Sequence, residues 1–403
     1  MSFKDRLHAL HRRLADPQAG GTGPLPGPCS PYGEPHGDCQ AARRAARCRL
    51  AACAAVYGAA VRRRNRAYDE GRREVVRAGV PVISIGNITA GGTGKTPMAA
   101  HLACLLRDRG RRPAILSRGY GRDPRSGLDD ENRMLARLAP GVPLVVRLDR
   151  AAGAREAVER LGADVLLLDD GFQHRRLARD LDVVLIDALM PFGGGRLLPL
   201  GWLREPLDGL ARAGAFVITR SDLADAECLD AIRSQLRRHA PDAPVALAVH
   251  RPVGARLLAG GAGGGVALDS LAGGRWGAFC GIGNPEGFRG TLRALGVEPV
   301  PFRAFPDHHR YGPDELAGLI EAAARDGLSG LLTTEKDEEK VLAALPAQVA
   351  VPVVALAVRM ELTEGGESLA GLVFRLAEPR MEADNEETTA GTRGKEAKPW
   401  NRG

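Results

Sequence analysis

The chain has 403 residues, of which 44% are hydrophobic and 26% are charged, and its formal net charge is +7. These proportions are typical of a globular protein that is long enough for two domains, each with its own core. The sequence contains no apolar run of the roughly 18 residues that a membrane-spanning helix needs. The N-terminal MSFKDRLHALHRR lacks an apolar centre, so we also expect no secretory signal.

The positive charge is concentrated in one segment of the chain. Residues 41–80 contain eleven arginines but only three acidic residues, an excess of eight charges that leaves the remainder close to neutral. A nucleic-acid-binding protein usually carries basic clusters on its main domain. We therefore expect no nucleic-acid partner.

Residues 1–40 are expected to form an irregular, disordered segment, since six prolines and many glycines lie between residues 14 and 40. Residues 41–79 then predict a basic helical segment, in which the helical pattern itself covers 41–77. Arginines border an apolar stripe on one face of this helix. Such a face suits contact with an anionic membrane, and it equally suits packing on the body of the protein. The stripe consists of Leu50, Ala54, Tyr57, Val61 and Tyr68.

From residue 80 onward, apolar strand-like runs alternate with helical stretches. This alternation predicts α/β layers around mostly parallel sheets. We expect a P-loop NTPase-like domain over residues 80–245, a smaller α/β domain over 246–378, and a disordered polar tail over 379–403. The predicted strands are 81–86, 113–117, 143–147, 164–169, 182–187, 214–219, 245–250, 276–280, 330–334 and 352–358.

The sequence GNITAGGTGKTP, residues 86–97, lies between a predicted strand and a predicted helix. Glycines allow backbone N–H groups to converge on an anion, and the following helix adds its positive end. A lysine in such a turn reaches the β- and γ-phosphates, and the hydroxyl after it ligates Mg²⁺. Thr89 departs from the usual pattern, because it stands where the first glycine falls. The predicted nucleotide site consists of Thr89, Ala90, Gly91, Gly92, Thr93, Gly94, Lys95 and Thr96.

A second motif, ADVLLLDDGFQH at residues 163–174, fits the metal-organising strand that usually accompanies a phosphate loop. Val165 to Leu168 predict a buried parallel strand, with Asp169 and Asp170 at its carboxyl end. Ligands bind at the carboxyl ends of strands in such sheets. We therefore predict that both aspartates, together with Thr96, take part in binding Mg²⁺.

These motifs alone leave three classes of function open. They are an NTPase, a kinase, whether for a soluble sugar, a cofactor or another acceptor, and a GTP-dependent switch of the metallochaperone type. The sequence TRSD at residues 219–222 bears on the last class, because it is similar to a motif that reads guanine. A simple turn after the preceding strand is the preferred explanation of TRSD.

Four motifs taken together resemble the tetraacyldisaccharide 4′-kinase family of lipid A biosynthesis. The resemblance covers about three quarters of the chain, from about residue 80 to about residue 376. The order of these motifs is far more specific than the phosphate loop alone. They are GNITAGGTGKTP, DDGFQHRRLARDLDVVLID at 169–187, FGGGRLLPLGWLREPL at 192–207, and TTEKD at 333–337.

The resemblance implies an ATP- and Mg²⁺-dependent kinase. Its acceptor would be the 4′-hydroxyl of an acylated glucosamine disaccharide 1-phosphate, tetraacyldisaccharide 1-phosphate, and its product lipid IVA. The resemblance also implies work at the cytoplasmic face of the bacterial inner membrane, with peripheral contact through residues 41–77. We expect a monomer.

The resemblance further implies roles for residues that serve the acceptor hydroxyl. Asp130 and Glu131, in GLDDENRML, match an acidic pair of the family. We expect Asp130 to be catalytic together with Lys95, and Glu131 to support the metal. These two acids also suit the first turn of a helix. In FPDHHRY, residues 305–311, His308 matches the family's histidine, and His309 remains the alternative.

Weaker matches concern the substrate. Gln173, His174 and Arg204 stand where the family suggests contacts to the substrate or to a phosphate. The fork of an arginine suits a phosphate, and a structural ion pair explains Arg204 equally well. TTEKD has the spacing of a helix start, and a role in the site is the second reading.

Overall fold

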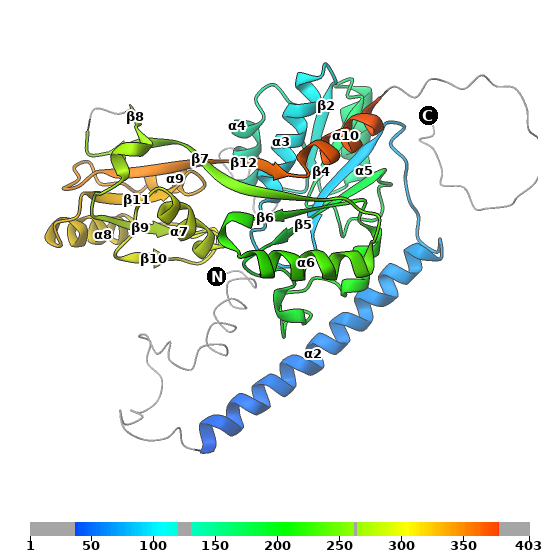
Figure 1. Ribbon diagram of the computed structural model, residues 1–403, viewed down its shortest axis with the longest axis horizontal. Coiled ribbons are helices and arrows are strands. Elements are labelled where there is room, and N and C mark those ends of the chain that lie inside the picture. Colours follow the sequence, from blue (N-terminus) through cyan, green and yellow to red (C-terminus); the bar gives the residue numbers. More distant parts are fainter. Residues whose placement is uncertain (1–36, 120–129, 262–263, 379–403) are drawn as a thin grey trace, which may run out of the picture.

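The computed structural model of the protein describes residues 37–119, 130–261 and 264–378. The predicted tail 379–403 lies outside these residues, as does the predicted irregular segment 1–40 except for its last four residues, which belong to a helix. The predicted fold class is confirmed, because strands and helices alternate around a mostly parallel sheet (Figure 1).

All ten predicted strands are present. Two further strands, β8 and β10, are only three residues long, too short to give a pattern in the sequence. The strands are β1 (Val82–Asn87), β2 (Pro113–Ser117), β3 (Leu144–Val146), β4 (Val165–Asp169), β5 (Leu181–Asp187), β6 (Ala215–Thr219), β7 (Val245–Ala259), β8 (Gly264–Val266), β9 (Trp276–Cys280), β10 (Phe302–Ala304), β11 (Gly330–Thr334) and β12 (Val353–Glu364).

Helices lie on both faces of the sheet and between most of its strands. The α-helices are α2 (Gly37–Asp69), α3 (Lys95–Asp108), α4 (Asp130–Leu138), α5 (Arg150–Glu159), α6 (Ala226–His239), α7 (Pro285–Ala294), α8 (Pro313–Arg325), α9 (Glu338–Leu342) and α10 (Gly366–Ala377), and the 3₁₀ turns are η1 (Gly193–Gly195), η2 (Leu207–Arg212), η3 (Ser221–Leu223) and η4 (Leu268–Leu271).

One continuous sheet runs through the whole described structure in the order β10-β9-β11-β12-β7-β6-β5-β1-β4-β2-β3, with β8 paired to β7. We call β1–β6 with α3–α6 the first lobe, and β8–β11 with α7–α9 the second lobe. In Figure 1 the second lobe lies to the left and the first lobe to the right. Strands β1, β4 and β5 at the centre of the first lobe are buried along their whole length, as parallel strands covered on both faces must be.

The two lobes are joined by β7 and β12, which are longer than predicted. They pair antiparallel from Val353 opposite Ala259 to Glu364 opposite Leu247, and the start of β7 also pairs with β6. The expected boundary between residues 245 and 246 therefore falls inside a strand. Because backbone hydrogen bonds continue through this point, the sheet has no break there.

Helix α10 also differs from the expected division. Its residues Leu369, Val373 and Ala377 are buried in the same core cluster as Met98 and Leu102 of α3. The segment expected as a second domain, 246–378, is therefore not one compact unit. Its last helix returns to the first lobe, because β12 runs back along β7 and delivers the chain there (Figure 1).

Helix α2 corrects two further expectations. It ends at Asp69 and not at residue 77. The predicted apolar stripe faces the protein: Ala54 and Val61 are buried, and Tyr57 Oη donates a hydrogen bond of 2.7 Å to the carbonyl of Arg204. The stripe is therefore a packing face. Its small residues allow close approach, since a Cβ on Gly58 would lie only 2.6 Å from a methyl carbon of Leu197.

The N-terminal turns of α2 project away from the lobes in Figure 1, and most of residues 45–53 are exposed. Within the part of the chain that the structure describes, no helix is long and apolar enough to cross a membrane.

The packing of α10 predicts a stability effect. Leu369 is 1% exposed, so Leu369→Ala should lower the free energy of unfolding by about 2–5 kcal/mol through lost burial and the cavity left behind. Urea denaturation measures this change. Leu161, which is 48% exposed, is the matched control, and Leu161→Ala should cost less than about 0.5 kcal/mol. Equal small effects at both positions would contradict the placement of α10 in the core.

Candidate active site

The phosphate loop, residues 88–94, connects β1 to α3. Gly94 precedes the helix with φ 89°, in the left-handed region that favours glycine. A Cβ atom at this position would lie 2.7 Å from Met360 Cε, so a larger residue does not fit without a shift. The glycine lets α3 begin directly at Lys95. The first-turn N–H groups of a helix have no partner inside it and form an anion-binding end.

Hydrogen bonds from three side chains hold the turn in place. Asn87 Nδ2 donates to Thr93 Oγ1 over 3.0 Å, and Thr219 Oγ1 donates to the carbonyl of Thr93, also over 3.0 Å. Arg220 Nη2 donates to the carbonyl of Gly92 over 2.9 Å. The loop is therefore fixed from behind by the strand ends that surround it.

The first two residues predicted for the nucleotide site have a different environment. The N–H of Ala90 donates to the carbonyl of Trp202 over 2.7 Å, and buried Thr89 forms a bridge with Leu203. These two residues tie the loop to the segment before Arg204. Residues 91–96 form the turn itself.

Lys95 and Thr96 point toward the two aspartates at the end of β4. Thr96 Oγ1 donates to Asp169 Oδ2 over 3.2 Å, and Lys95 Nζ lies 3.7 Å from Asp170 Oδ1. The structure thus brings the phosphate loop and the second motif together, as their order in the sequence predicted.

Asp170 adopts a positive φ of 50°, which turns its side chain toward cations. Arg204 binds both of its carboxylate oxygens, at 2.6 Å and 3.1 Å. Arg150 donates to the carbonyls of Asp170 and Asp169, at 2.9 Å and 2.5 Å. Arg204 is therefore committed to an ion pair with Asp170, which is one of the two roles its sequence allowed.

The pKa values of the two neighbouring aspartates are shifted in opposite directions. Burial, followed by the charges of Glu131 and Asp170, raises the pKa of Asp169 to about 7. Burial acts on Asp170 in the same sense, but the charges of Arg204 and Lys95 outweigh it and bring its pKa well below the usual range. The negative charge of Asp170 is thus compensated by Arg204 and Lys95, whereas burial and nearby acids disfavour the negative charge of Asp169.

Thr96 and Asp169 fit a Mg²⁺ ion. Asp169 Oδ1 is buried and has no hydrogen-bond partner within the described residues, while Oδ2 accepts from Thr96. Hydroxyl and carboxylate oxygens are the donors that Mg²⁺ prefers. Residues 37–119, 130–261 and 264–378 contain no cluster of three or more His, Cys, Asp or Glu side chains suited to a metal. Phosphate oxygens and water would have to complete the coordination, as is usual beside a phosphate loop.

The predicted acidic pair lies at the start of α4, which begins at Asp130. The side chain of Asp130 and residues 120–129 are outside the described part of the structure. Glu131 is half-buried, and its charge raises the pKa of both Asp169 in the first lobe and Lys336 in the second. Glu131 therefore lies between the metal-binding end of β4 and the second lobe.

The second lobe meets the phosphate loop through a glycine contact. A Cβ on Gly283 would lie 3.0 Å from the nitrogen of Gly92, and Asn284 Nδ2 donates to Asp187 Oδ2 over 2.6 Å. Asp307 lies close to the same point, because its Oδ2 would be 3.1 Å from this Cβ of Gly283. Asp307 of the second lobe therefore lies next to the phosphate loop of the first lobe.

The two adjacent histidines have different surroundings. His308 has φ 62°, is 43% exposed at its side chain, and places Nε2 3.8 Å from Asp307 Oδ2. His309 stacks on Phe305 with ring centroids 4.6 Å apart, and its Nε2 lies 2.8 Å from Glu315 Oε2. The geometry favours His308 as the residue that faces ligands and His309 as a packing residue.

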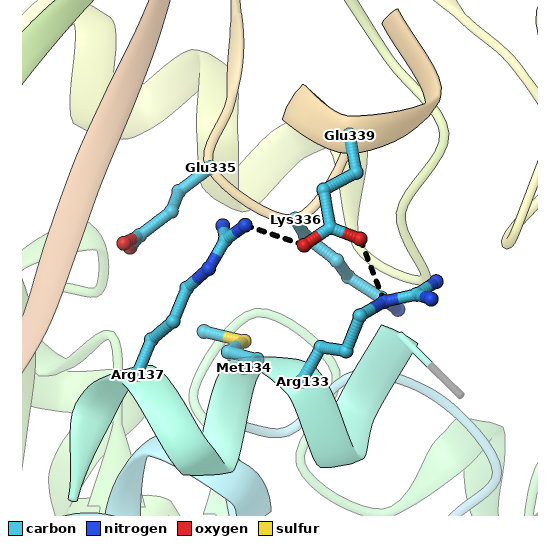
Figure 2. Close-up of a pocket in the computed structure, with 6 residues that line it drawn as sticks. All are labelled: Arg133, Met134, Arg137, Glu335, Lys336 and Glu339. Carbon is cyan, nitrogen blue, oxygen red and sulfur yellow. Dashed lines mark hydrogen bonds and ion pairs between the residues drawn. The ribbon is translucent and has the colours of Figure 1, made fainter. Parts of the chain in front are cut away.

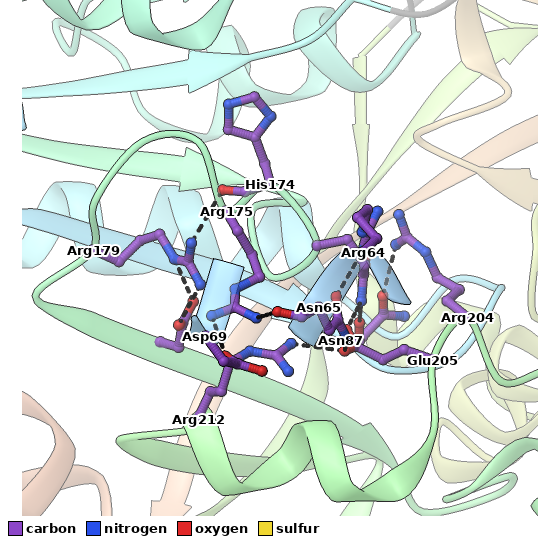
Figure 3. Close-up of polar contacts among 12 residues, drawn as sticks. Arg64, Asn65, Asp69, Asn87, His174, Arg175, Arg179, Arg204, Glu205 and Arg212 are labelled. Carbon is purple, nitrogen blue, oxygen red and sulfur yellow. Dashed lines mark hydrogen bonds and ion pairs between the residues drawn. The ribbon is translucent and has the colours of Figure 1, made fainter. Parts of the chain in front are cut away.

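Arg204 belongs to a polar cluster beside α2 (Figure 3), and Gln173 joins this cluster through hydrogen bonds. Gln173 Nε2 donates to the carbonyl of Asn87 over 2.8 Å and to Glu205 Oε1 over 2.9 Å. Arg204 Nη1 donates to Asn87 Oδ1 over 3.2 Å, and Asn65 Nδ2 donates to Glu205 Oε2 over 3.0 Å. The cluster links α2 to the end of β1, next to the phosphate loop.

His174 lies apart from this cluster, and its ring points away from it in Figure 3. Burial, helped by Arg150 and Arg179, lowers the pKa of His174 to about 4. Its Nε2 is buried and has no hydrogen-bond partner in the described part of the chain. His174 is therefore neutral at neutral pH and retains hydrogen-bonding capacity.

The TRSD segment supports the phosphate loop from behind. Arg220 has φ 56° and pairs with Asp187 at 2.8 Å while also holding Gly92, and Ser221 begins the short turn η3. The arrangement matches the turn reading of TRSD.

Sequence reasoning did not single out Asn87, Glu205 or Lys336. Asn87 ends a buried strand directly before the phosphate loop, and Glu205 directly follows Arg204 in a quoted motif, so position was a usable signal for both. Lys336 stands in TTEKD, for which a site role was the second reading. Nothing local distinguishes it from an exposed lysine.

The raised pKa of Asp169 predicts how stability depends on pH. Because its folded pKa of about 7 exceeds the ordinary 3.8, its contribution is fully present below about pH 3.8 and is lost as the pH rises through 7. Without nucleotide and Mg²⁺, Asp169→Asn should therefore be more stable than the unaltered chain at about pH 8, on the order of 2–4 kcal/mol, with a smaller gap at about pH 5.

Chemical denaturation at both pH values measures these differences. Asp170→Asn is the matched control, because its lowered pKa stabilises the folded state above the unfolded pKa. It should destabilise the protein at about pH 8. A shift in the same direction for both variants would contradict the opposite environments of the two carboxylates.

Comparisons with known proteins show the family to which this chain belongs. The family model described as tetraacyldisaccharide-1-P 4′-kinase matches residues 46–373. The tetraacyldisaccharide 4′-kinase of Anaeromyxobacter dehalogenans is 46% identical over 330 residues, covering 78% of this chain and 86% of that relative. The enzyme of Syntrophus aciditrophicus is 42% identical over 328 residues, covering 76% and 87%.

Among solved structures, the "apo" form of LpxK from Aquifex aeolicus in complex with ATP is 32% identical. It superposes with a TM-score of 0.60 and covers 82% of this chain and 99% of that one. The extent of these matches confirms the resemblance seen in the motifs, and this chain belongs to the tetraacyldisaccharide 4′-kinase family.

Proposed function

We propose that this chain transfers the γ-phosphate of ATP to the 4′-hydroxyl of tetraacyldisaccharide 1-phosphate, forming lipid IVA. Membership of the kinase family supports this reaction. The observation that carries the proposal is the contact between the two lobes beside the phosphate loop. Thr96 and Lys95 lie next to Asp169 and Asp170, and a Cβ on Gly283 would lie 3.0 Å from the nitrogen of Gly92 and 3.1 Å from Asp307 Oδ2.

ATP binds in the phosphate loop, with its triphosphate along residues 91–96 and at the N-terminus of α3. The ammonium of Lys95 reaches the β- and γ-phosphates. Thr96 and Asp169 would hold Mg²⁺, which supplies charge neutralisation on the phosphoryl group in transfer. Asp170 contributes by holding Lys95 and Arg204 next to Asp169, and Glu131 adds negative charge near Asp169.

The acceptor is served by residues from both lobes. Asp130, at the start of α4, takes the proton of the 4′-hydroxyl as that oxygen attacks the γ-phosphorus. His308, from the second lobe, holds and polarises Asp130 during this step. The contact of Gly283 with Gly92 supports such an arrangement, because it keeps the lobes close enough to exclude water from the γ-phosphate.

Gln173, His174 and Arg204 contact the acceptor sugar and its phosphates. The low pKa of His174 suits hydrogen bonds to sugar hydroxyls, because a neutral imidazole both donates and accepts. Arg204 serves through its ion pair with Asp170, which places a guanidinium beside the phosphate loop. Gln173 and Arg204 are linked through Asn87, because both donate hydrogen bonds to it.

The substrate is acylated, and α2 is the segment that contacts the membrane holding it. The contact face is not the predicted stripe but the outer face of the helix, where exposed small apolar residues lie between arginines. Val56, at 71% exposure, is its largest apolar member. The enzyme then acts as a monomer, peripherally, at the cytoplasmic face of the bacterial inner membrane. The outer face comprises Ala51, Ala52, Cys53, Ala55, Val56, Ala59 and Ala60.

A transfer assay tests the function. Radiolabelled ATP, Mg²⁺ and tetraacyldisaccharide 1-phosphate should yield a doubly phosphorylated lipid, whereas GTP or a soluble sugar acceptor should not support turnover. Lys95→Ala should lower the rate at least about 100-fold without changing the melting temperature. Asp130→Asn should lower kcat about 10²–10⁴-fold while ATP affinity changes less than about twofold. Equal losses of kcat and affinity would make Asp130 a binding residue.

The membrane proposal predicts a separate effect. Val56→Asp places a charge on the outer face of α2 and should reduce sedimentation with vesicles of anionic phospholipid at least about threefold. The matched control is Val253→Asp in β7, where Val253 is 51% exposed. This control should bind vesicles like the unaltered chain. Unchanged binding of Val56→Asp would assign membrane contact to another surface.

A further inference from the structure

Lys336 is a buried cation that the mechanism above does not use. It lies between β11 and α9 in the second lobe, with its Nζ 3.1 Å from Asp307 Oδ1. The side chains of Lys336 and Asp307 are 17% and 5% exposed. Figure 2 shows Lys336 facing α4 of the first lobe, beside Arg133 and Glu339.

The turn that carries Lys336 is fixed by its neighbours. Thr334 Oγ1 donates to Asp337 Oδ2 over 2.8 Å, and the N–H of Asp337 donates back to Thr334 Oγ1 over 3.2 Å. Asp337 Oδ2 also accepts from the N–H of Gly281 over 2.9 Å, and the carbonyl of Gly281 accepts from the N–H of His308 over 3.0 Å. Lys336 is therefore held in a constant position relative to His308.

Lys336 binds Oδ1 of Asp307, on the side of the carboxylate away from Oδ2. Asp307 Oδ2 faces His308 Nε2 at 3.8 Å, next to the point where Gly283 meets the phosphate loop. A buried carboxylate needs a cation to remain charged. Lys336 meets this need at Oδ1, and this ion pair helps to fix the orientation of the Asp307 carboxylate beside His308.

The side chain of Lys336 remains protonated and positively charged at neutral pH. Burial lowers its pKa, but Asp307 and Glu131, followed by Asp337, outweigh burial and raise the pKa to about 12. Glu131 belongs to the acidic pair at the start of α4. Lys336 is thus placed between acidic groups of the two lobes, one beside each of the candidate acceptor residues Asp130 and His308.

We propose that Lys336 is a positioning residue for phosphoryl transfer, which orients His308 through Asp307. This inference rests on the proposed function, because it concerns the acceptor side of the same reaction. It predicts an effect on the chemical step and little effect on ATP binding, since the phosphate loop belongs to the other lobe.

The test compares Lys336→Met, Lys336→Arg, Asp307→Asn and the double variant in the transfer assay. Lys336→Met should lower kcat about 10–100-fold, with the KM for ATP within about twofold. Lys336→Arg, which keeps the charge, should recover kcat to within about fivefold of the unaltered chain. The double variant should be no slower than Asp307→Asn by more than about twofold, because residues that act as a unit are not additive.

Several results would overturn the inference. They are a kcat of Lys336→Met within twofold of the unaltered chain, losses that multiply in the double variant, or an increase in the KM for ATP that accounts for the whole effect. Arg325→Met removes an exposed cation in the last turn of α8, in the same lobe, and should change kcat less than about twofold. An equal loss there would mean that the effect is not specific to Lys336.

Two features keep the test decisive. If Lys336→Met fails to fold because it strands a buried carboxylate, the double variant removes both charges together, and its comparison with Asp307→Asn still measures the coupling. The unaltered chain is assayed first. Absence of a doubly phosphorylated lipid would reject the proposed function, whereas normal turnover with unaffected Lys336 variants rejects this inference alone.

Discussion

The backbone of Gly283 lies directly against Gly92, and this contact determines how the two lobes meet. A Cβ on Gly283 would be 3.0 Å from the nitrogen of Gly92, so any larger residue would push the two main chains apart by a few tenths of an ångström. Arg220 and Asn284 both bind Asp187 and fasten the same region from either side. Because the contact is between main chains, no side chain intervenes that rearranges easily. The phosphate loop and the segment of the second lobe that carries Asp307 and His308 therefore meet at a fixed contact.

Carboxylates near this contact form ion pairs with cationic side chains from distant segments of the chain. Asp170 depends on Arg204, and Asp307 depends on Lys336. Asp169 differs, because burial and neighbouring acids oppose its charge and its Oδ1 has no hydrogen-bond partner among the described residues. A buried carboxylate of this kind is suited to receive a cation together with phosphate ligands.

The long helix α2 has an inner face that packs on the first lobe and an outer face that is exposed. Its inner face carries Tyr57 and Asn65, which contact Arg204 and Glu205 next to the phosphate loop. Its outer face is small, apolar and exposed. A helix that touches both the catalytic lobe and, by our proposal, the membrane would hold the site at a defined height above the lipid surface. The arginines of α2 suit both tasks, since their long apolar stems pack while their charged ends reach solvent or anionic lipid.

Local patterns determined the strands, the glycine turn at Gly94 and the helix that follows it, because strand burial and left-handed φ values depend on neighbouring residues. They also placed Asp169 beside Thr96, since the carboxyl ends of parallel strands share one edge of the sheet. The roles of these residues in the reaction remain predictions. Only the tertiary structure decided the packing face of α2, the return of α10 to the first lobe, and the pairing of Lys336 with Asp307. These depend on contacts between segments far apart in the chain, which no local pattern of charge or hydrophobicity encodes.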